Sequence, residues 1–275
     1  MTKQGKKTGD LSAFEIKAPS GVDKGKALAV TGGPLIVAGD IPPDYLCATG
    51  AGRGSEHVAI EDLVIPRLEV VQALSPAVKD GDPGFIQGAR PGMLTNSVTR
   101  QLYGTEVFVV PVHYTKQFLV WKERKAGGGF FGAFATPEDA KGRIATIEGD
   151  KSQIMVIDTP QHLCLIVTDG KAEKIMIPMP RTKAKISRQW NTFVSLAGGD
   201  RFARVYRVGV QMQKNQKGDF YNYTIAQSGF PAQRLYKHAE DLYTQIASGE
   251  RNVRMDVTGY DAGHEPEAGE AGAEM

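Results

Sequence analysis

The sequence predicts an α+β fold in which strands dominate. Short segments rich in Val, Ile and aromatic residues recur between Gly, Pro, Asn and Asp turn signals from about residue 65 to residue 226. Helical spacing of apolar residues is clearest in two stretches, 182–197 and 233–247. We therefore expect a folded body at 59–255, preceded by a flexible Gly/Lys-rich arm at 1–58 and followed by an acidic tail at 256–275.

The arm contains few large apolar residues, a composition typical of disorder. Residues 35–37 are a candidate for a short strand or a docking segment. Residues 50–54, with the sequence GAGRG, superficially resemble a phosphate-binding loop. They follow no convincing strand, open no helix and lack the Lys-Ser or Lys-Thr ending of such loops. We interpret them as a linker.

The first half of the body consists of predicted strands and turns. Residues 93–104 predict a hairpin that turns around 96–99. The apolar run 107–112 predicts a strand buried on both faces, with 118–121 as a neighbouring strand. Further strands are expected at 153–157, 163–167 and 174–177, with Asp169-Gly170 as the last turn.

Residues 122–134 join a charged segment to aromatic residues through three consecutive glycines. Lys122 and Arg124 come before the glycines, and Phe130 and Phe131 come after them. The segment is either a mobile loop that closes over a ligand or a long hairpin connection whose rings fold back onto the core. Thr136, Pro137 and Glu138 then have the cap, Pro and acid order of a short helix start.

Two longer helices follow. Thr182 is expected to cap the first, whose Trp190 and Phe193 fall on one apolar stripe and are therefore predicted core residues. Gly198-Gly199 should end it. The second spans 233–247, with Gly249 as its stop.

The clearest hairpin pairs 203–213 with 219–226. Placing Lys214 opposite Asp219 puts Tyr206 and Tyr221 on one face, and Arg207 and Phe220 on the other. A shift of one residue in register would exchange the two faces.

Cations and aromatic rings alternate most densely in residues 181–225. This stretch has nine Lys or Arg residues against two acids, with seven aromatic residues among them. Cations displace condensed counterions from phosphates, and flat rings offer faces on which bases stack. The pattern favours binding to an unpaired polynucleotide.

The charge distribution agrees with this interpretation. Residues 256–275 contain six acids and no Lys or Arg, so the formal charge of +2 would rise to +8 without them. A basic body suits a polyanionic partner. The acidic tail is either a solubilising segment or a mobile polyanion that competes with DNA and docks partner proteins.

Other function classes lack support in the sequence. Cys47 and Cys164 form no CxxC motif, and the five histidines have no metal-ligand spacing, so we expect no metal site and no cofactor. No stretch approaches the roughly 18 apolar residues of a membrane span, and the N-terminus lacks a signal peptide. The expected location is a reducing cytoplasm.

We expect no enzymatic activity, because no catalytic constellation is evident. One alternative remains open. Glu123-Arg124-Lys125 has the acid-x-Lys form of many metal-dependent nucleases, for which Asp158 is a candidate second carboxylate.

Four segments and the tail together resemble phage-encoded single-stranded DNA-binding proteins of the acidic-tailed replication type. The segments are IPRLEVVQALSP (65–76), GARPGMLTNSVTRQLYG (88–104), WKERKAGGGFFGAF (121–134) and RFARVYRVGVQMQKNQKGDFYNYTI (201–225). The resemblance implies an OB-like β-barrel, here elaborated with two helices, that coats strands exposed in replication or recombination. It also implies that the tail recruits replication or transcription proteins. The chain differs from that pattern in its length, its Gly-rich arm and the absence of a terminal aromatic residue.

We therefore predict sequence-independent binding of single-stranded DNA in phage replication or recombination, by a chain that could form homo-oligomers. The alternatives are a phage virion or assembly protein and the nuclease. The residues expected to contact phosphates are Lys183, Lys185, Arg188, Arg204, Arg207, Lys214 and Lys217, with Lys122 and Arg124 from the glycine-rich segment. The residues expected to stack on bases are Phe130, Phe131 and Phe220, with Tyr206 or Tyr221.

Overall fold

The structure, a computed structural model, describes residues 29–30, 33–34, 57, 64–123, 127–168, 170–215 and 218–248. The chain divides after His57 into two units. In the first unit, β1 (Ala29–Val30) pairs antiparallel with β2 (Gly33–Pro34). The predictions for 35–37, 50–54, Gly249 and the tail lie outside the described residues, as do Arg124 and Lys217.

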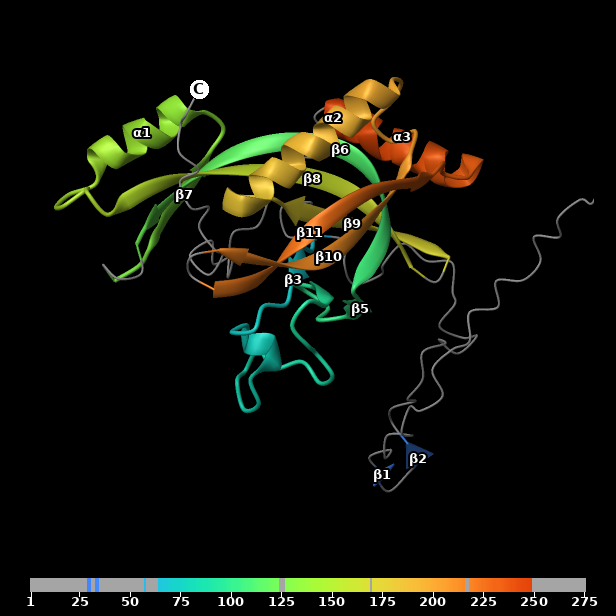
Figure 1. Cartoon of the computed structure of the whole chain (residues 1–275), viewed down its shortest axis with the longest axis horizontal. Coiled ribbons are helices and arrows are strands. Elements are labelled where there is room, and N and C mark those ends of the chain that lie inside the picture. Colours follow the sequence, from blue (N-terminus) through green and yellow to red (C-terminus); the bar gives the residue numbers. More distant parts are fainter. Residues whose placement is uncertain are drawn as a thin grey trace, which may run out of the picture. The chain divides into compact units, whose positions relative to one another are not determined.

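The second unit contains two sheets and three α-helices among its described residues (Figure 1). The larger sheet has the order β11-β10-β6-β8-β9, and β7 also pairs with β6. Its strands are β6 (Glu106–Lys122), β7 (Phe130–Phe134), β8 (Ile154–Thr168), β9 (Lys171–Pro178), β10 (Val205–Asn215) and β11 (Gly218–Gly229). The smaller sheet consists of β3 (Leu68–Val70), β4 (Leu94–Asn96) and β5 (Leu102–Gly104). The strand-dominated α+β class is confirmed.

The helices are α1 (Pro137–Thr146), α2 (Ala184–Ala197) and α3 (Gln233–Ala247). The bounds of α3 agree with the prediction, and Gly198 ends α2 with φ 66°. Thr182 does not cap α2, because a 3-10 turn, Arg181–Lys183, leads directly into the helix. Helix α1 is additional to the two predicted long helices. It begins after Thr136, whose hydroxyl accepts a hydrogen bond from the Asp139 N–H at 3.1 Å.

The strands β6 and β8 are longer than predicted. Residues 107–112 and 118–121 belong to one strand and are not neighbours, and β8 likewise continues through 158–162. The predicted breaks fall at the polar stretches 113–117 and 158–162. Each long strand also contains a proline, which lacks the N–H that a strand ladder uses. Pro111 is accommodated by a register shift before His113, and the Pro160 carbonyl still accepts the Met179 N–H at 2.8 Å.

Alternating side chains give the larger sheet two apolar faces. Helix α2 covers one face, here called the α2 face, where Trp190 packs with Val109, Cys164 and Tyr206. In Figure 1, α2 lies in front of the sheet. Helix α3 covers part of the opposite α3 face, with Leu242 near Val110 and Leu163 in a second cluster. The smaller sheet also packs on the α2 face, through residues such as Leu68 and Leu94.

A side chain also attaches the segment after β3 to the outer strand β11. The Gln72 amide donates to the Tyr221 carbonyl at 2.8 Å, and its oxygen accepts the Tyr221 N–H at 2.9 Å. This reciprocal pair imitates one rung of a β-ladder. It is reinforced nearby, where the Tyr223 hydroxyl donates to the Leu68 carbonyl at 2.7 Å.

A buried polar cluster lies beneath α2. Arg201 donates to His162 Nδ1 at 2.8 Å, and arginine has only donors, so Nδ1 must be the acceptor. His162 Nε2 therefore carries the proton and donates to Ser187 Oγ at 2.8 Å. The His162 ring also stacks on Trp190, with centroids 4.4 Å apart. A histidine that donates to a serine cannot activate it as a base, so this cluster is a packing device.

Burial, together with the Arg201 cation, holds the pKa of His162 well below its ordinary value of 6.5. The unfolded chain binds this proton near pH 6.5, whereas the folded chain does not, so folding stability falls as the pH drops below about 6.5. We expect the melting temperature to decrease between pH 7.5 and pH 5. His162→Gln should make this decrease smaller, because an amide can accept from Arg201 and donate to Ser187 without titrating.

Differential scanning fluorimetry across this pH range tests the expectation. Part of the decrease should persist in the variant, because burial and Arg201 also lower the pKa of His113. His238→Gln on the exposed side of α3 is the control. If the melting temperature of the His162→Gln protein decreased equally steeply, protonation of His162 would not be a cause of the loss of stability.

Candidate nucleic-acid interface

The hairpin of β10 and β11 extends beyond the rest of the sheet as a two-stranded arm. β6 pairs with β10 only from Tyr206 to Gly209, whereas β10 and β11 stay paired out to Asn215 and Gly218. Lys214 lies opposite Asp219, which confirms the predicted register. Val210 and Tyr223 of this arm still pack on the core, whereas exposed Lys214 lies at its tip on the α2 face.

Helix α2 places cations close to this arm. Lys185 and Arg188 are exposed on the outward side of the helix, while Ile186 and Trp190 point into the core. Both α2 and the 3-10 turn before it contact β11. Between Glu173 and Asp200 the sequence has no acidic residue, so no carboxylate on this helix opposes the cations.

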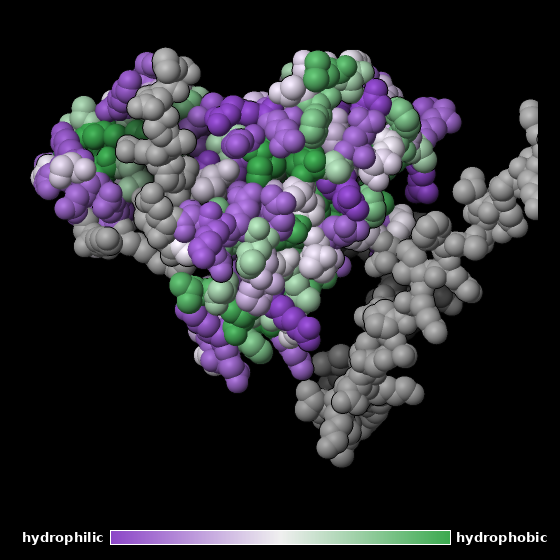
Figure 2. Space-filling view, viewed as in Figure 1, coloured by the Kyte–Doolittle hydropathy of each residue, from purple (hydrophilic) through white to green (hydrophobic). Residues whose placement is uncertain are grey.

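We define the α2–arm surface as Lys185, Arg188, Met212, Lys214 and Tyr221. Met212 is exposed and Tyr221 is half-buried, and these two residues are cross-strand neighbours. Hydrophilic residues cover much of the front of the molecule around α2 and the arm in Figure 2. The surface thus combines three exposed cations with an apolar side chain and a partly accessible ring.

Lys183 does not belong to this surface. It is buried, and its Nζ lies 5.2 Å from the centroid of the Tyr223 ring. The predicted direct contact with a phosphate is therefore wrong for Lys183, because the turn before α2 directs the side chain inward. Its charge lies beneath the surface, where it adds to the positive potential of the region.

Two of the predicted stacking residues are also buried. Tyr206 is 0% exposed and lies edge-on to Trp190, with centroids 5.7 Å apart, because the register turns it toward α2. Phe220 is on the other face of the arm and is also buried. Neither ring can offer a face to a base. Tyr221 remains partly accessible, and Gly92 allows its close approach, since a Cβ there would lie 2.8 Å from Tyr221 Cε1.

Arg204 and Arg207 lie apart from the α2–arm surface. Arg204 donates to the Ala197 carbonyl at the end of α2 at 3.1 Å, and its guanidinium is 5.0 Å from the Phe230 ring centroid. Arg207 points to the α3 face, where it forms an ion pair with Glu106 at 3.6 Å. The structure thus divides the predicted cations between the two faces of the sheet.

The predicted glycine-rich segment is a hairpin connection, at least in its described part. Phe130–Phe134 forms β7 and pairs with β6, and the Phe130 ring lies 4.8 Å from Trp121. The rings thus fold back onto the sheet, as the second interpretation expected. Lys122 and Phe131 are half-buried in this hairpin, while Phe130 is exposed.

The carboxylates of the nuclease alternative do not converge. Glu123 follows β6, and its N–H donates to the Gln153 carbonyl at 2.9 Å. Asp158 stands opposite Phe118, and its carboxylate accepts from Lys116 Nζ at 3.0 Å. The two acids are about five residues apart along the strands, or roughly 16 Å, which is too far for them to share a metal ion. Among the described residues, no group of three or more His, Cys, Asp or Glu is placed to hold one.

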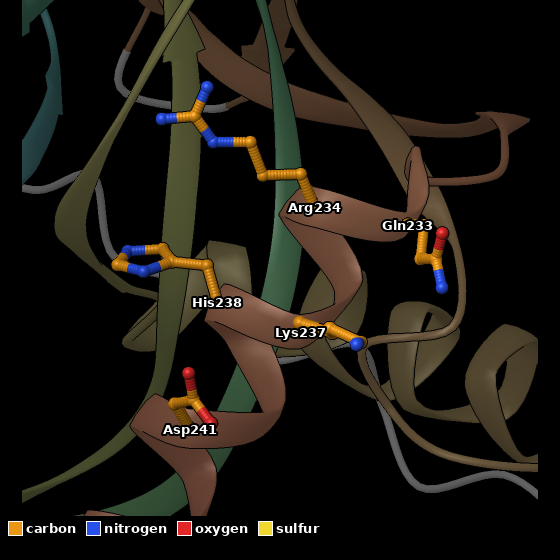
Figure 3. Close-up of a pocket in the computed structure, with 5 residues that line it drawn as sticks. All are labelled: Gln233, Arg234, Lys237, His238 and Asp241. Carbon is orange, nitrogen blue, oxygen red and sulfur yellow. The ribbon is translucent and has the colours of Figure 1, made fainter.

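A shallow hollow of about 460 Å³ lies along the exposed side of α3 (Figure 3). Its lining side chains project from successive turns of the helix and are Gln233, Arg234, Lys237, His238 and Asp241. The sequence pattern indicated this helix only by its apolar stripe, and the opposite, polar side was not predicted as a surface feature. The 3.6-residue period of the helix could have indicated this side.

A family model matches residues 37–252, which is most of the chain. The model describes the Pam3 phage gp34-like protein. The chain belongs to the Pam3 phage gp34-like family. The phage part of the resemblance seen in the sequence is therefore confirmed. Comparison of this gp34-like protein with curated proteins and with solved structures gave no match. None of its described helices has the length and apolar character needed to cross a membrane.

The placement of Tyr206 predicts that its replacement affects folding. We expect Tyr206→Ala to lower the free energy of unfolding by roughly 3–5 kcal/mol, the cost of emptying an aromatic site in a core. Phe130→Ala, at a residue that is 37% exposed, should cost much less. Urea unfolding monitored by circular dichroism measures both. Equal losses in the two variants would mean that Tyr206 does not have the core role assigned to it.

Proposed function

We propose that this gp34-like protein binds single-stranded DNA through the α2–arm surface, in phage replication or recombination. The observation that supports this most directly is the acid-free helix α2, whose exposed Lys185 and Arg188 lie over a hairpin that bears Lys214. On α2 no carboxylate neutralises the cations, whereas Lys214 stands opposite Asp219. Cations without a carboxylate beside them are the groups that release counterions from a phosphate backbone.

The arm suits a flexible, unpaired ligand. Lys214 can contact phosphates, and the partly accessible Tyr221 ring and the Met212 side chain offer apolar contacts to bases. Tyr206 and Phe220 have no part in this proposal because they are buried. Binding would therefore depend more on phosphate contacts, and less on stacking, than the sequence suggested.

An OB-like barrel also belongs to the proposal. The described strands β11 and β9 end the strand order without pairing with each other, so barrel closure stays a prediction. Recruitment of replication or transcription proteins by residues 256–275 is likewise proposed, on the basis of the tail's six acids.

A second candidate function is a virion or assembly protein. Its support is the apolar exposure around Arg204, where Leu196 is 81% exposed and Phe230 is 72% exposed. Arg204 lies over the ring of Phe230 and donates to the carbonyl of Ala197, the residue that follows Leu196 in the chain. Such groups are common at protein interfaces. The virion role requires the protein in purified particles and large homo-oligomers without DNA.

Removal of two cations from α2 tests the DNA-binding proposal. We expect Lys185→Ala combined with Arg188→Ala to weaken binding to a fluorescein-labelled dT oligonucleotide in 50 mM salt by at least about tenfold. For single strands, each lost phosphate contact reduces the slope of log K against log salt by about 0.7, so the slope should fall by about 1.4. Fluorescence anisotropy at several salt concentrations measures both quantities.

Lys141→Ala on α1 is the matched control, because it removes an exposed cation far along the chain from α2. It should leave the slope unchanged. The proposal would be contradicted if the affinity of the natural chain for the oligonucleotide did not change with salt concentration, or if its affinity for duplex DNA were equally high. An unchanged slope in the double variant would exclude the α2–arm surface as the DNA-binding site.

Deletion of residues 256–275 should tighten binding. The deletion removes six acids, so the formal charge rises from +2 to +8. A gel shift with single-stranded and duplex oligonucleotides, run on the full and shortened chains, measures the effect. Weaker binding by the shortened chain would mean that the tail assists DNA binding and does not compete with it.

A further inference from the structure

A hollow of about 250 Å³ lies where β6 begins and β8 ends. This volume is below the roughly 300–1,000 Å³ typical of pockets for drug-sized ligands, so it suits a single ring system. The residues that give it its chemistry are Gln101, Leu102, Tyr103, Glu106, Phe108 and Thr168. It therefore combines aromatic rings with a carboxylate, an amide and a hydroxyl.

Phe108 is the most unusual of these residues. The sequence predicted residues 107–112 to be buried on both faces, yet Phe108 is 41% exposed. It points to the α3 face, as Val110 does, but the cluster around α3 includes Val110 and Val112 and does not extend to Phe108. The sheet thus leaves one aromatic ring open to solvent at its end.

A cation and a carboxylate flank this ring. Arg207 is the cross-strand neighbour of Phe108 on β10, so both side chains lie on the same face. Glu106 precedes Phe108 by two residues on that face, and its Oε2 lies 3.6 Å from Arg207 Nη1. Both side chains of this ion pair are about half exposed. Glu106 therefore still has lone pairs to offer to a ligand.

The same face of β10 connects the hollow to the arm. Gln213, Gln211 and Arg207 lie on this face, with Gly209 between Gln211 and Arg207, whereas Lys214 at the tip lies on the α2 face. From Gln213 to Arg207 the distance is about six residues, or roughly 20 Å, which a few nucleotides of an extended strand can span. Polar side chains therefore lie along this face from near the tip of the arm to the Phe108 ring, with a gap at Gly209.

We propose that this hollow binds one base of the bound strand, stacked on Phe108, and that it selects bases with an exocyclic amino group. The inference rests on the proposed function. Glu106 is an acceptor, so it can receive a hydrogen bond from the amino group of cytosine. Thymine presents a carbonyl oxygen at the equivalent position, which a carboxylate repels. Arg207 holds Glu106 in place and lies close enough to approach the adjoining phosphate.

The test compares oligonucleotides of dC and dT of equal length on the full chain. We expect the natural protein to bind dC about threefold to tenfold more tightly than dT by fluorescence anisotropy. Glu106→Gln should reduce this ratio to about one, because an amide can donate to thymine as well as accept from cytosine. Phe108→Leu should weaken binding to both oligonucleotides about threefold or more, because it keeps the apolar volume and removes the flat ring.

Phe85→Leu is the matched control, since Phe85 is exposed to a similar degree and does not line the hollow. It should change neither the ratio nor the affinity. Thermal melts of all variants establish that they are folded. Equal binding of dC and dT by the natural chain, or an unchanged ratio in Glu106→Gln, overturns the base-selecting hollow while salt-dependent binding still supports the proposed function. Failure of the natural chain to bind either oligonucleotide overturns both.

Discussion

The packing of Trp190 against the sheet positions the rest of the proposed site. Its ring stacks on His162 and meets Tyr206 edge-on, and Arg201 and Ser187 hold His162 from both sides. Because Trp190 points inward, the other side of α2 must point outward. The exposure of Lys185 and Arg188 is thus a direct consequence of a buried aromatic cluster.

The α2 face and the α3 face of the larger sheet now have distinct proposed roles. On the α2 face, cations from a helix and a hairpin tip can neutralise a phosphate backbone. On the α3 face, Arg207, Glu106 and Phe108 form a smaller and more selective group. The long stretch that appeared in the sequence as one cationic, aromatic segment is divided by the alternation of side chains along β10.

Local patterns predicted a large part of the fold. The register of the 203–226 hairpin, the bounds of α3 and the glycine end of α2 depend on neighbouring residues, and all three were correct. The long strands β6 and β8 were not predicted, because the polar stretches 113–117 and 158–162 separate the apolar runs, and only the pairing partners show that each strand continues. The exposure of Phe108 and the burial of Lys183 depend on where α3 and α2 end over the sheet, which a single sequence does not reveal.

The amide of Gln72 has a consequence for self-association. An outer strand such as β11 ordinarily invites another chain to extend the sheet by main-chain pairing. Gln72 already occupies the hydrogen-bonding groups of Tyr221, so an incoming strand would first have to displace it. Polymers built by edge-to-edge strand addition at this rung of β11 are therefore disfavoured.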